Sequence, residues 1–134
     1  MRNNLWLQKR LQQIWELLFP DTPKLNSVII KFKGSSFRKF GHIKRIGFDT
    51  EIAINSLFQY ELVPEYIIDI TIAHELIHYM HGFNSPLQKK YKHPHKGGIV
   101  TKELKSKGFL NMLKREKIFI KREWPKIYKA IKDV

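Results

Sequence analysis

Residues 64–82 read PEYIIDITIAHELIHYMHG, and this stretch decides how the rest of the chain is interpreted. Pro64 and Glu65 suit a first helical turn, where a missing N–H costs nothing and negative charge is favoured. Gly82 suits the position just past a helix. The stretch between is apolar nearly all round, through Ile67, Ile68, Ile70, Ile72, Ala73, Leu76, Ile77 and Met80. A helix that is hydrophobic on every side is buried, so the stretch predicts a buried central helix.

Three polar residues, His74, Glu75 and His78, interrupt this apolar helix. At about 100° per residue the two histidines share one face, one turn apart, and can reach one ion. Glu75 stands beside the first of them and could take a proton from water, whose pKa zinc lowers to about 7. Burying three polar groups without partners costs on the order of several kcal/mol, which a metal relieves. The HELIH pattern therefore predicts a zinc site; the alternative is a chance match on an ordinary helix.

A catalytic zinc site takes three protein ligands and leaves one position open. The polar loop 83–98 is long enough to fold back on the helix, and its HPH turn offers His95 as the expected third ligand, with His93 next. Glu103, on the following helix, is a further alternative. His81 lies one turn beyond the HELIH motif, too far round for the same ion, and we expect it beside the site or on the surface.

The segments before the central helix predict one helix and three strands. Residues 4–19 carry apolar side chains at helical spacing. Residues 27–34 and 46–55 in part alternate apolar with polar residues and predict strands. Between them, residues 34–45 predict a glycine-bounded turn that leads into another strand. Three short strands in a row favour an antiparallel or mixed sheet. His42 falls in this strand region, and we expect it to be structural.

The last third predicts further short elements. We expect a basic helix over 99–107, a short helix and a strand at KIFI (117–120), and a final helix over 125–134. The fold class expected for the whole chain is α+β, with a short mixed or antiparallel sheet packed on the N-terminal helix and the buried HELIH helix. We expect a single domain over 1–134, with a basic C-terminal extension from about 109.

Composition excludes several classes of protein. The chain contains no cysteine, which excludes a disulfide framework and a thiolate zinc ribbon. The N-terminal residues 1–20 mix charged and amide side chains into the apolar ones, unlike a secretory signal. No stretch approaches the roughly 18 apolar residues of a membrane span. We therefore expect a soluble, cytoplasmic protein without a membrane partner.

The positive charge is concentrated in the C-terminal part. Residues 85–134 hold 15 Lys/Arg against 4 Asp/Glu, whereas residues 1–84 hold 10 against 8. Such asymmetry indicates a polyanionic partner, above all nucleic acid. The alternative is a lysine-rich surface that only contacts solvent.

Residues 43–110 resemble the SprT-like zinc metallopeptidases. The family's order of strand, HExxH helix, variable loop and histidine turn is matched by EIAINSLF (51–58), VPEYIIDITIAHELIHYMHG (63–82) and HPHKGGIVTKELKSKGF (93–109). The WLM and YgjP-like groups have a similar layout, but the longer spacing to the third histidine favours SprT-like. The resemblance implies a zincin-like, minigluzincin-type fold and a zinc-dependent endopeptidase, with His74, His78 and His95 as ligands and Glu75 as general base.

The resemblance also implies a partner and a compartment. Spartan and WLM members cleave proteins crosslinked to DNA in DNA repair, so we expect DNA as a partner and a nucleoid-associated location. Relatives often carry a four-cysteine ribbon that this chain lacks, so DNA binding would rest on lysines and on Tyr91, Phe109, Phe119, Trp124 and Tyr128.

Several functional questions stay open at this stage. The candidates to stabilise an oxyanion are His81, Tyr79 and Tyr91. The alternative functions are a basic nucleic-acid-binding protein with a structural metal site and a zinc hydrolase of a non-peptide substrate.

Overall fold

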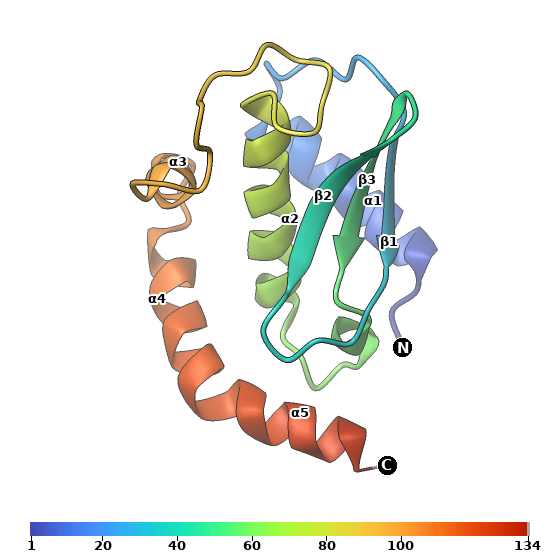
Figure 1. The fold of residues 1–134 in the computed structure, drawn as a ribbon. Helices are drawn as coiled ribbons and strands as arrows, with labels where there is room; N and C mark the ends of the chain where they lie inside the picture. Colours follow the sequence, from blue (N-terminus) through green and yellow to red (C-terminus); the bar gives the residue numbers. More distant parts are fainter. Residues whose placement is uncertain (134) are drawn as a thin grey trace.

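A three-stranded mixed sheet forms one layer of the α+β fold that a computed structural model describes for residues 1–133 (Figure 1). Its strands are β1 (Val28–Phe32), β2 (Gly41–Ile46) and β3 (Asp49–Ile54), in the spatial order β1-β3-β2. β3 runs parallel to β1 and antiparallel to β2, so Ile52 stands opposite both Ile30 and Ile43. The predicted strands are confirmed, and β2 is left as a free edge of the sheet.

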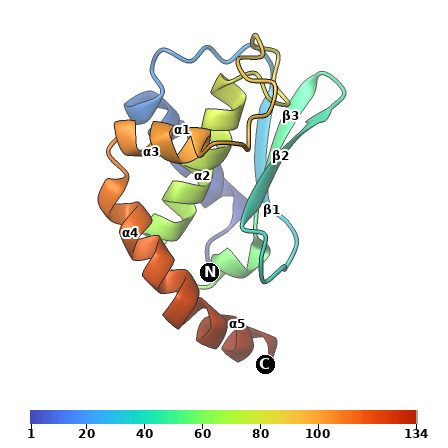
Figure 2. The ribbon, with the colours of Figure 1, turned by 60° about the vertical axis from the view of Figure 1, so that its left-hand side comes forward.

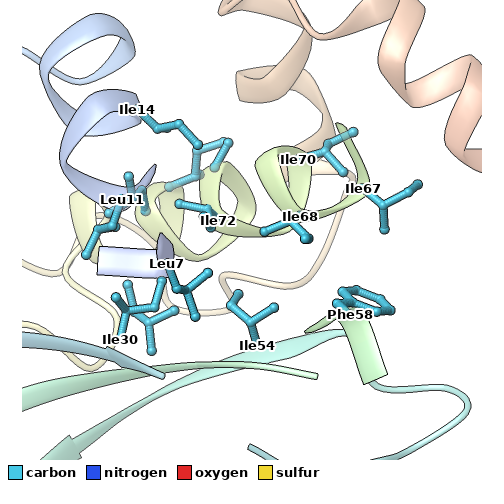
Figure 3. Close-up of a cluster of buried hydrophobic side chains, with 14 of the residues drawn as sticks. Leu7, Leu11, Ile14, Ile30, Ile54, Phe58, Ile67, Ile68, Ile70 and Ile72 are labelled. Carbon is cyan, nitrogen blue, oxygen red and sulfur yellow. The ribbon is translucent and has the colours of Figure 1, made fainter. Parts of the chain in front are cut away.

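Two helices, α1 (Asn4–Leu18) and α2 (Glu65–Met80), pack on one face of this sheet. Figure 3 shows the core that they enclose, with Leu7, Leu11 and Ile14 from α1, Ile67, Ile68, Ile70 and Ile72 from α2, Ile30 and Ile54 from the sheet, and Phe58. The guanidinium of Arg10 donates two hydrogen bonds of 2.6 Å to the carboxylate of Asp69, and this ion pair fixes α1 against α2.

The central helix is buried as its composition predicts. Its Ile67, Ile68, Ile72 and Ile77 are fully inaccessible to solvent. Pro64 precedes its first residue in an extended conformation, and Gly82 follows it with a φ of +76°. An added Cβ at Gly82 would also collide with the backbone of Gln88, because the following loop turns back over the helix end.

The chain after that loop is helical. A short 3₁₀ helix, η1 (Ser56–Gln59), precedes α2, and the loop leads to α3 (Ile99–Ser106), α4 (Leu110–Ile118), η2 (Phe119–Glu123) and α5 (Trp124–Lys132). Figure 2 shows α3 and α4 beside α2, with α5 continuing beyond the lower end of α2. The final helix is confirmed, although residue 134 of its expected range lies outside the described residues. None of the helices described over 1–133 combines the length and the apolar character needed to cross a membrane.

The predicted strand at KIFI (117–120) is wrong. These residues belong to a continuous helical arm, in which η2 is a single π-helical turn between α4 and α5. The β-branched and aromatic residues favour a strand locally, but Leu113, Ile120 and Trp124 stand seven and four residues apart, at helical spacing, and line one cleft. Pro125 lacks an N–H to bond backwards, which accounts for the widened turn just before it.

The arm is part of the packed body. Phe109, Phe119 and Trp124 have exposed fractions of 5%, 3% and 1%. The edge of the Trp124 ring meets the rings of Phe40 and Phe58, at centroid distances of 5.7 and 5.4 Å. The three buried aromatic residues therefore cannot offer their faces to nucleic-acid bases, which corrects that part of the sequence-based expectation.

Candidate metal centre and its cleft

His74 and His78 face one another across one turn of α2. Their Nε2 atoms lie 3.2 Å apart, with ring centroids separated by 4.9 Å. Two ligands of a tetrahedral ion with bonds of about 2.05 Å stand about 3.3 Å apart. The spacing of the two imidazoles is therefore the one that a single ion needs. Together with Glu75 they form a group whose ligand atoms all lie within 4.8 Å of one another, and this group could hold a metal ion.

Burial keeps both imidazoles neutral, which is the form that binds metal. It lowers the pKa of His74 to about 4, helped by nearby His95. It lowers the pKa of His78 to about 3, with further contributions from the neighbouring histidines. The Nδ1 atom of His78 is buried and has no hydrogen-bond partner among the described residues. Within residues 1–133 the two Nε2 atoms have no protein partner other than one another, and a metal ion would engage both of them.

The loop after α2 brings His95 to this pair. The ring of His95 lies 4.5 Å from that of His78, and Phe83 packs against both rings. The loop is held by backbone hydrogen bonds from Phe83 N to His78 O and from Lys90 N to His81 O, each 2.9 Å long. His95 is exposed on its other side and stands outside the compact group of three ligand atoms.

The other candidate ligands are placed differently. Glu103 lies against His81, with its Oε1 3.3 Å from the ring Nε2, and His81 is only 1% exposed. Tyr91 packs its ring on the same histidine at 4.8 Å. His93 is exposed, and the structure shows no contact of its ring with the HELIH pair. Of the two positions expected for His81, the one on the surface is wrong, because the residue is buried where it ties the end of α2 to α3.

Of the three candidates to stabilise an oxyanion, none lines the cleft beside the metal group. The hydroxyl of Tyr79 donates to Asn26 Oδ1 at 2.7 Å, on the side facing α1 and the start of the sheet. His81 pairs with Glu103, and the ring of Tyr91 packs on the ring of His81. Other polar side chains do line the cleft, namely Arg38 and Lys39 from the loop before β2 and Thr71 from α2.

Glu75 is buried beside the free edge of the sheet. Its Oε2 would lie 3.3 Å from a Cβ added to Gly41, the first residue of β2. The same Cβ would lie 2.9 Å from Thr71 Cγ2 and 3.0 Å from the carbonyl oxygen of Ala53, so the close approach requires a glycine. Burial raises the pKa of Glu75 to about 7, against the pull of the Lys39 ammonium. A carboxyl with that pKa can both accept and return a proton near neutral pH.

A cleft of about 690 Å³ opens beside His74 and Glu75. Its apolar walls come from three distant segments, namely the loop before β2, the first half of α2 and the helical arm, and include Phe37, Phe40, Ile70, Leu113, Ile120 and Trp124. Its polar groups include Lys39, Thr71 and Glu116. The candidate metal group therefore lies on a cavity of the size that ligands occupy.

Sequence reasoning missed the loop before β2 and the arm as parts of this site. The pattern around Phe37 to Gly41 indicates only a turn, and Glu116 lies in the segment expected as a basic C-terminal extension. The one local signal was the glycine at the start of a predicted strand, since a glycine there often marks a close approach of another group.

Comparisons with protein-family models, with curated proteins and with solved structures find no match to this chain.

Proposed function

We propose that this protein is a zinc-dependent endopeptidase of the SprT-like type, with a zincin-like core. The observation that carries the proposal is the 3.2 Å separation of the His74 and His78 Nε2 atoms beside buried Glu75, on an open cleft. His74, His78 and His95 would hold the ion, and a neutral-imidazole set suits zinc. Bound zinc would supply a Lewis acid that acidifies water and polarises a carbonyl group.

The protein residues have separate tasks in peptide hydrolysis. Glu75 takes a proton from the attacking water, whose oxygen adds to the scissile carbonyl carbon. When the C–N bond breaks, Glu75 returns that proton to the leaving amine. The free edge of β2 can pair with an extended peptide backbone, because no neighbouring strand covers it. The apolar cleft walls then exclude water from the reacting groups.

The test combines metal content with proteolysis. Wild-type protein, Glu75→Gln and His74→Ala would be reconstituted with zinc, dialysed, and measured by elemental mass spectrometry. The same samples would then be incubated with unfolded casein, with and without a chelator. We expect about one zinc per chain and cleavage in the wild type, zinc without cleavage in Glu75→Gln, and neither in His74→Ala.

Two results would replace the proposal. Zinc without cleavage of any unfolded or DNA-bound protein would favour a structural metal site in a nucleic-acid-binding protein. Cleavage of a non-peptide ester or amide alone, lost with the chelator, would favour a zinc hydrolase of another substrate.

We also propose that the arm binds DNA, so that the substrates are DNA-associated or DNA-crosslinked proteins in the cytoplasm and nucleoid. The outer side of α4, η2 and α5 exposes six cations that take part in no ion pair among the described residues, namely Lys114, Lys117, Lys121, Arg122, Lys126 and Lys129. The acids of this segment are fewer than its cations, since Glu116 lines the cleft and, up to residue 133, only Glu123 and Asp133 are exposed there. Binding to duplex DNA should weaken steeply with salt.

A further inference from the structure

The cleft contains one carboxylate that the proposed chemistry does not use. Glu116 lies on α4 and lines the same cavity as His74 and Glu75. It is half-buried, and burial raises the pKa of its carboxyl. It forms no ion pair and no side-chain hydrogen bond with the other described residues, as the ion pairs of residues 1–133 show. Arg115, its neighbour on the arm, lies over the ring of Tyr66 at 4.2 Å. Arg38 and Lys39 line the same cleft from the loop before β2, but neither forms an ion pair with Glu116.

The surroundings of Glu116 are mostly apolar. Leu113 and Ile120 stand one turn before it and one turn after it on the arm, and both line the cleft. Leu104 and Ile70 contribute apolar side chains from α3 and α2. A carboxylate in such a setting loses much of its hydration without gaining a partner. Its burial is therefore unfavourable in free energy unless a group bound in the cleft donates a hydrogen bond to the carboxylate.

A long cationic side chain of a substrate would be a suitable partner for the Glu116 carboxylate. The methylene stem of a lysine or arginine can lie along the apolar walls, while its charged end reaches the carboxylate. A purely apolar side chain would fill the walls but leave Glu116 without a partner. An acidic side chain would meet a like charge. The cleft borders the group that would do the chemistry, so the side chain it holds belongs to a residue near the scissile bond.

We propose that Glu116 selects substrates with a lysine or arginine next to the cleaved bond, and that the cleft between α2 and the arm is the pocket for that side chain. This inference rests on the proposed endopeptidase activity. It names basic polypeptide segments as the substrate class, which the chemistry of the metal group alone does not specify.

The test uses peptides that differ at one position. Quenched fluorescent peptides would carry lysine, norleucine or glutamate beside the bond, because norleucine keeps the lysine stem without its ammonium. In zinc-loaded wild type we expect kcat/KM for lysine to exceed that for norleucine by about tenfold, the usual effect of a charge-assisted hydrogen bond. In Glu116→Gln the ratio should fall to about one, and in Glu116→Lys the glutamate peptide should become the best substrate.

Glu123→Gln is the matched control, since Glu123 is exposed on the same arm and does not line the cleft. It should keep the wild-type ratio. The inference is overturned if wild type does not distinguish lysine from norleucine, or if Glu116→Gln distinguishes them as well as wild type does. Circular dichroism of each variant would check that the fold is kept.

A second readout separates this inference from the endopeptidase proposal. Binding of labelled lysine and norleucine peptides to the zinc-loaded protein would be measured by fluorescence anisotropy. If neither casein nor any peptide is cleaved, the proposed activity fails. Tighter binding of the lysine peptide, lost in Glu116→Gln, would still support the pocket, and equal binding of both peptides would overturn it.

Discussion

The indole N–H of Trp124 donates a hydrogen bond of 2.8 Å to the carbonyl oxygen of Phe37, which lies 87 residues earlier in the chain. The two rings also stack, with an interplanar angle of 8°. On the other side of the same loop, Asn55 Nδ2 donates to the carbonyl oxygen of Lys39 at 3.0 Å. The loop that walls the cleft is thus held between the arm and the end of β3.

Truncating this tryptophan should destabilise the whole fold. Trp124→Ala removes a side chain that is 1% exposed, and we expect the free energy of unfolding to fall by about 3–5 kcal/mol. Urea unfolding would measure the change. Ile118→Ala, at a residue of the same arm that is 56% exposed, should lie within about 0.5 kcal/mol of wild type. Equal effects of the two variants would mean that the arm does not pack on the core.

Replacing His95 should weaken zinc binding far more than replacing His93 or Glu103. The ring of His95 stands 4.5 Å from that of His78, whereas Glu103 is engaged with His81. A competition titration with a chromophoric chelator should show a loss of about a hundredfold or more for His95→Ala, beyond the usual effect of changing a residue around a metal site. His93→Ala should match wild type. A larger loss in His93→Ala or Glu103→Gln would move the third ligand there.

The metal-free protein should lose stability as the pH falls from 7 to 5. The folded pKa values of His74 and His78, about 4 and about 3, lie below their ordinary value of 6.5, so the unfolded chain binds protons first. Glu75 has a folded pKa raised from 4.5 to about 7, so it releases about one proton on unfolding and offsets part of the effect of the histidines. Together these three groups take up about one proton on unfolding, which contributes a slope of about 1 kcal/mol per pH unit.

Two variants separate these contributions. Glu75→Gln removes the opposing proton, so its stability should fall about twice as steeply in acid. The double variant His74→Gln/His78→Gln should reverse or flatten the dependence. Urea unfolding at pH 5, 6 and 7 in the presence of a chelator would measure all three slopes. A wild-type protein that is as stable at pH 5 as at pH 7 would show that the two histidines are not held neutral.

Charge reversal on the outer side of the arm should weaken DNA binding and its salt dependence. Lys117 and Lys121 are exposed there, and a Lys117→Glu/Lys121→Glu variant should lower the slope of log affinity against log salt by about two. Fluorescence anisotropy with a labelled duplex would measure it. Lys9→Glu/Lys44→Glu changes the net charge equally but at exposed positions on α1 and β2. If both variants bind alike, the attraction comes from net charge and no particular surface is involved.

Most of the fold follows from local patterns, and the site does so only in part. The spacing in α2 is a property of one helix, so both histidines and Glu75 could be placed together from sequence. The parallel pairing of β1 with β3 depends on segments separated in the chain, and the sequence left the sheet as antiparallel or mixed. KIFI was misjudged because packing on the core outweighs its strand propensity.

The remaining parts of the site come from long-range contacts. The residues next to Glu103 in the chain do not show that its carboxylate pairs with His81. Those next to Glu116 do not show that it lines a cleft together with Glu75. Gly41 carried a local signal, but its meaning depends on the carboxylate that it approaches. Such relationships are fixed by how α3 and the arm dock on α2, which composition and periodicity do not encode.

The helical arm presents two chemically different faces, one lined by Leu113 and Trp124 toward the cleft and one lined by exposed lysines toward solvent. An α-helix with its side chains is only about 10–12 Å thick. A polyanion bound outside and a polypeptide bound inside would therefore be separated by a single helix. A protein attached to that polyanion would be presented to the cleft at a high effective concentration, so even weak affinity for the cleaved segment would be enough for turnover.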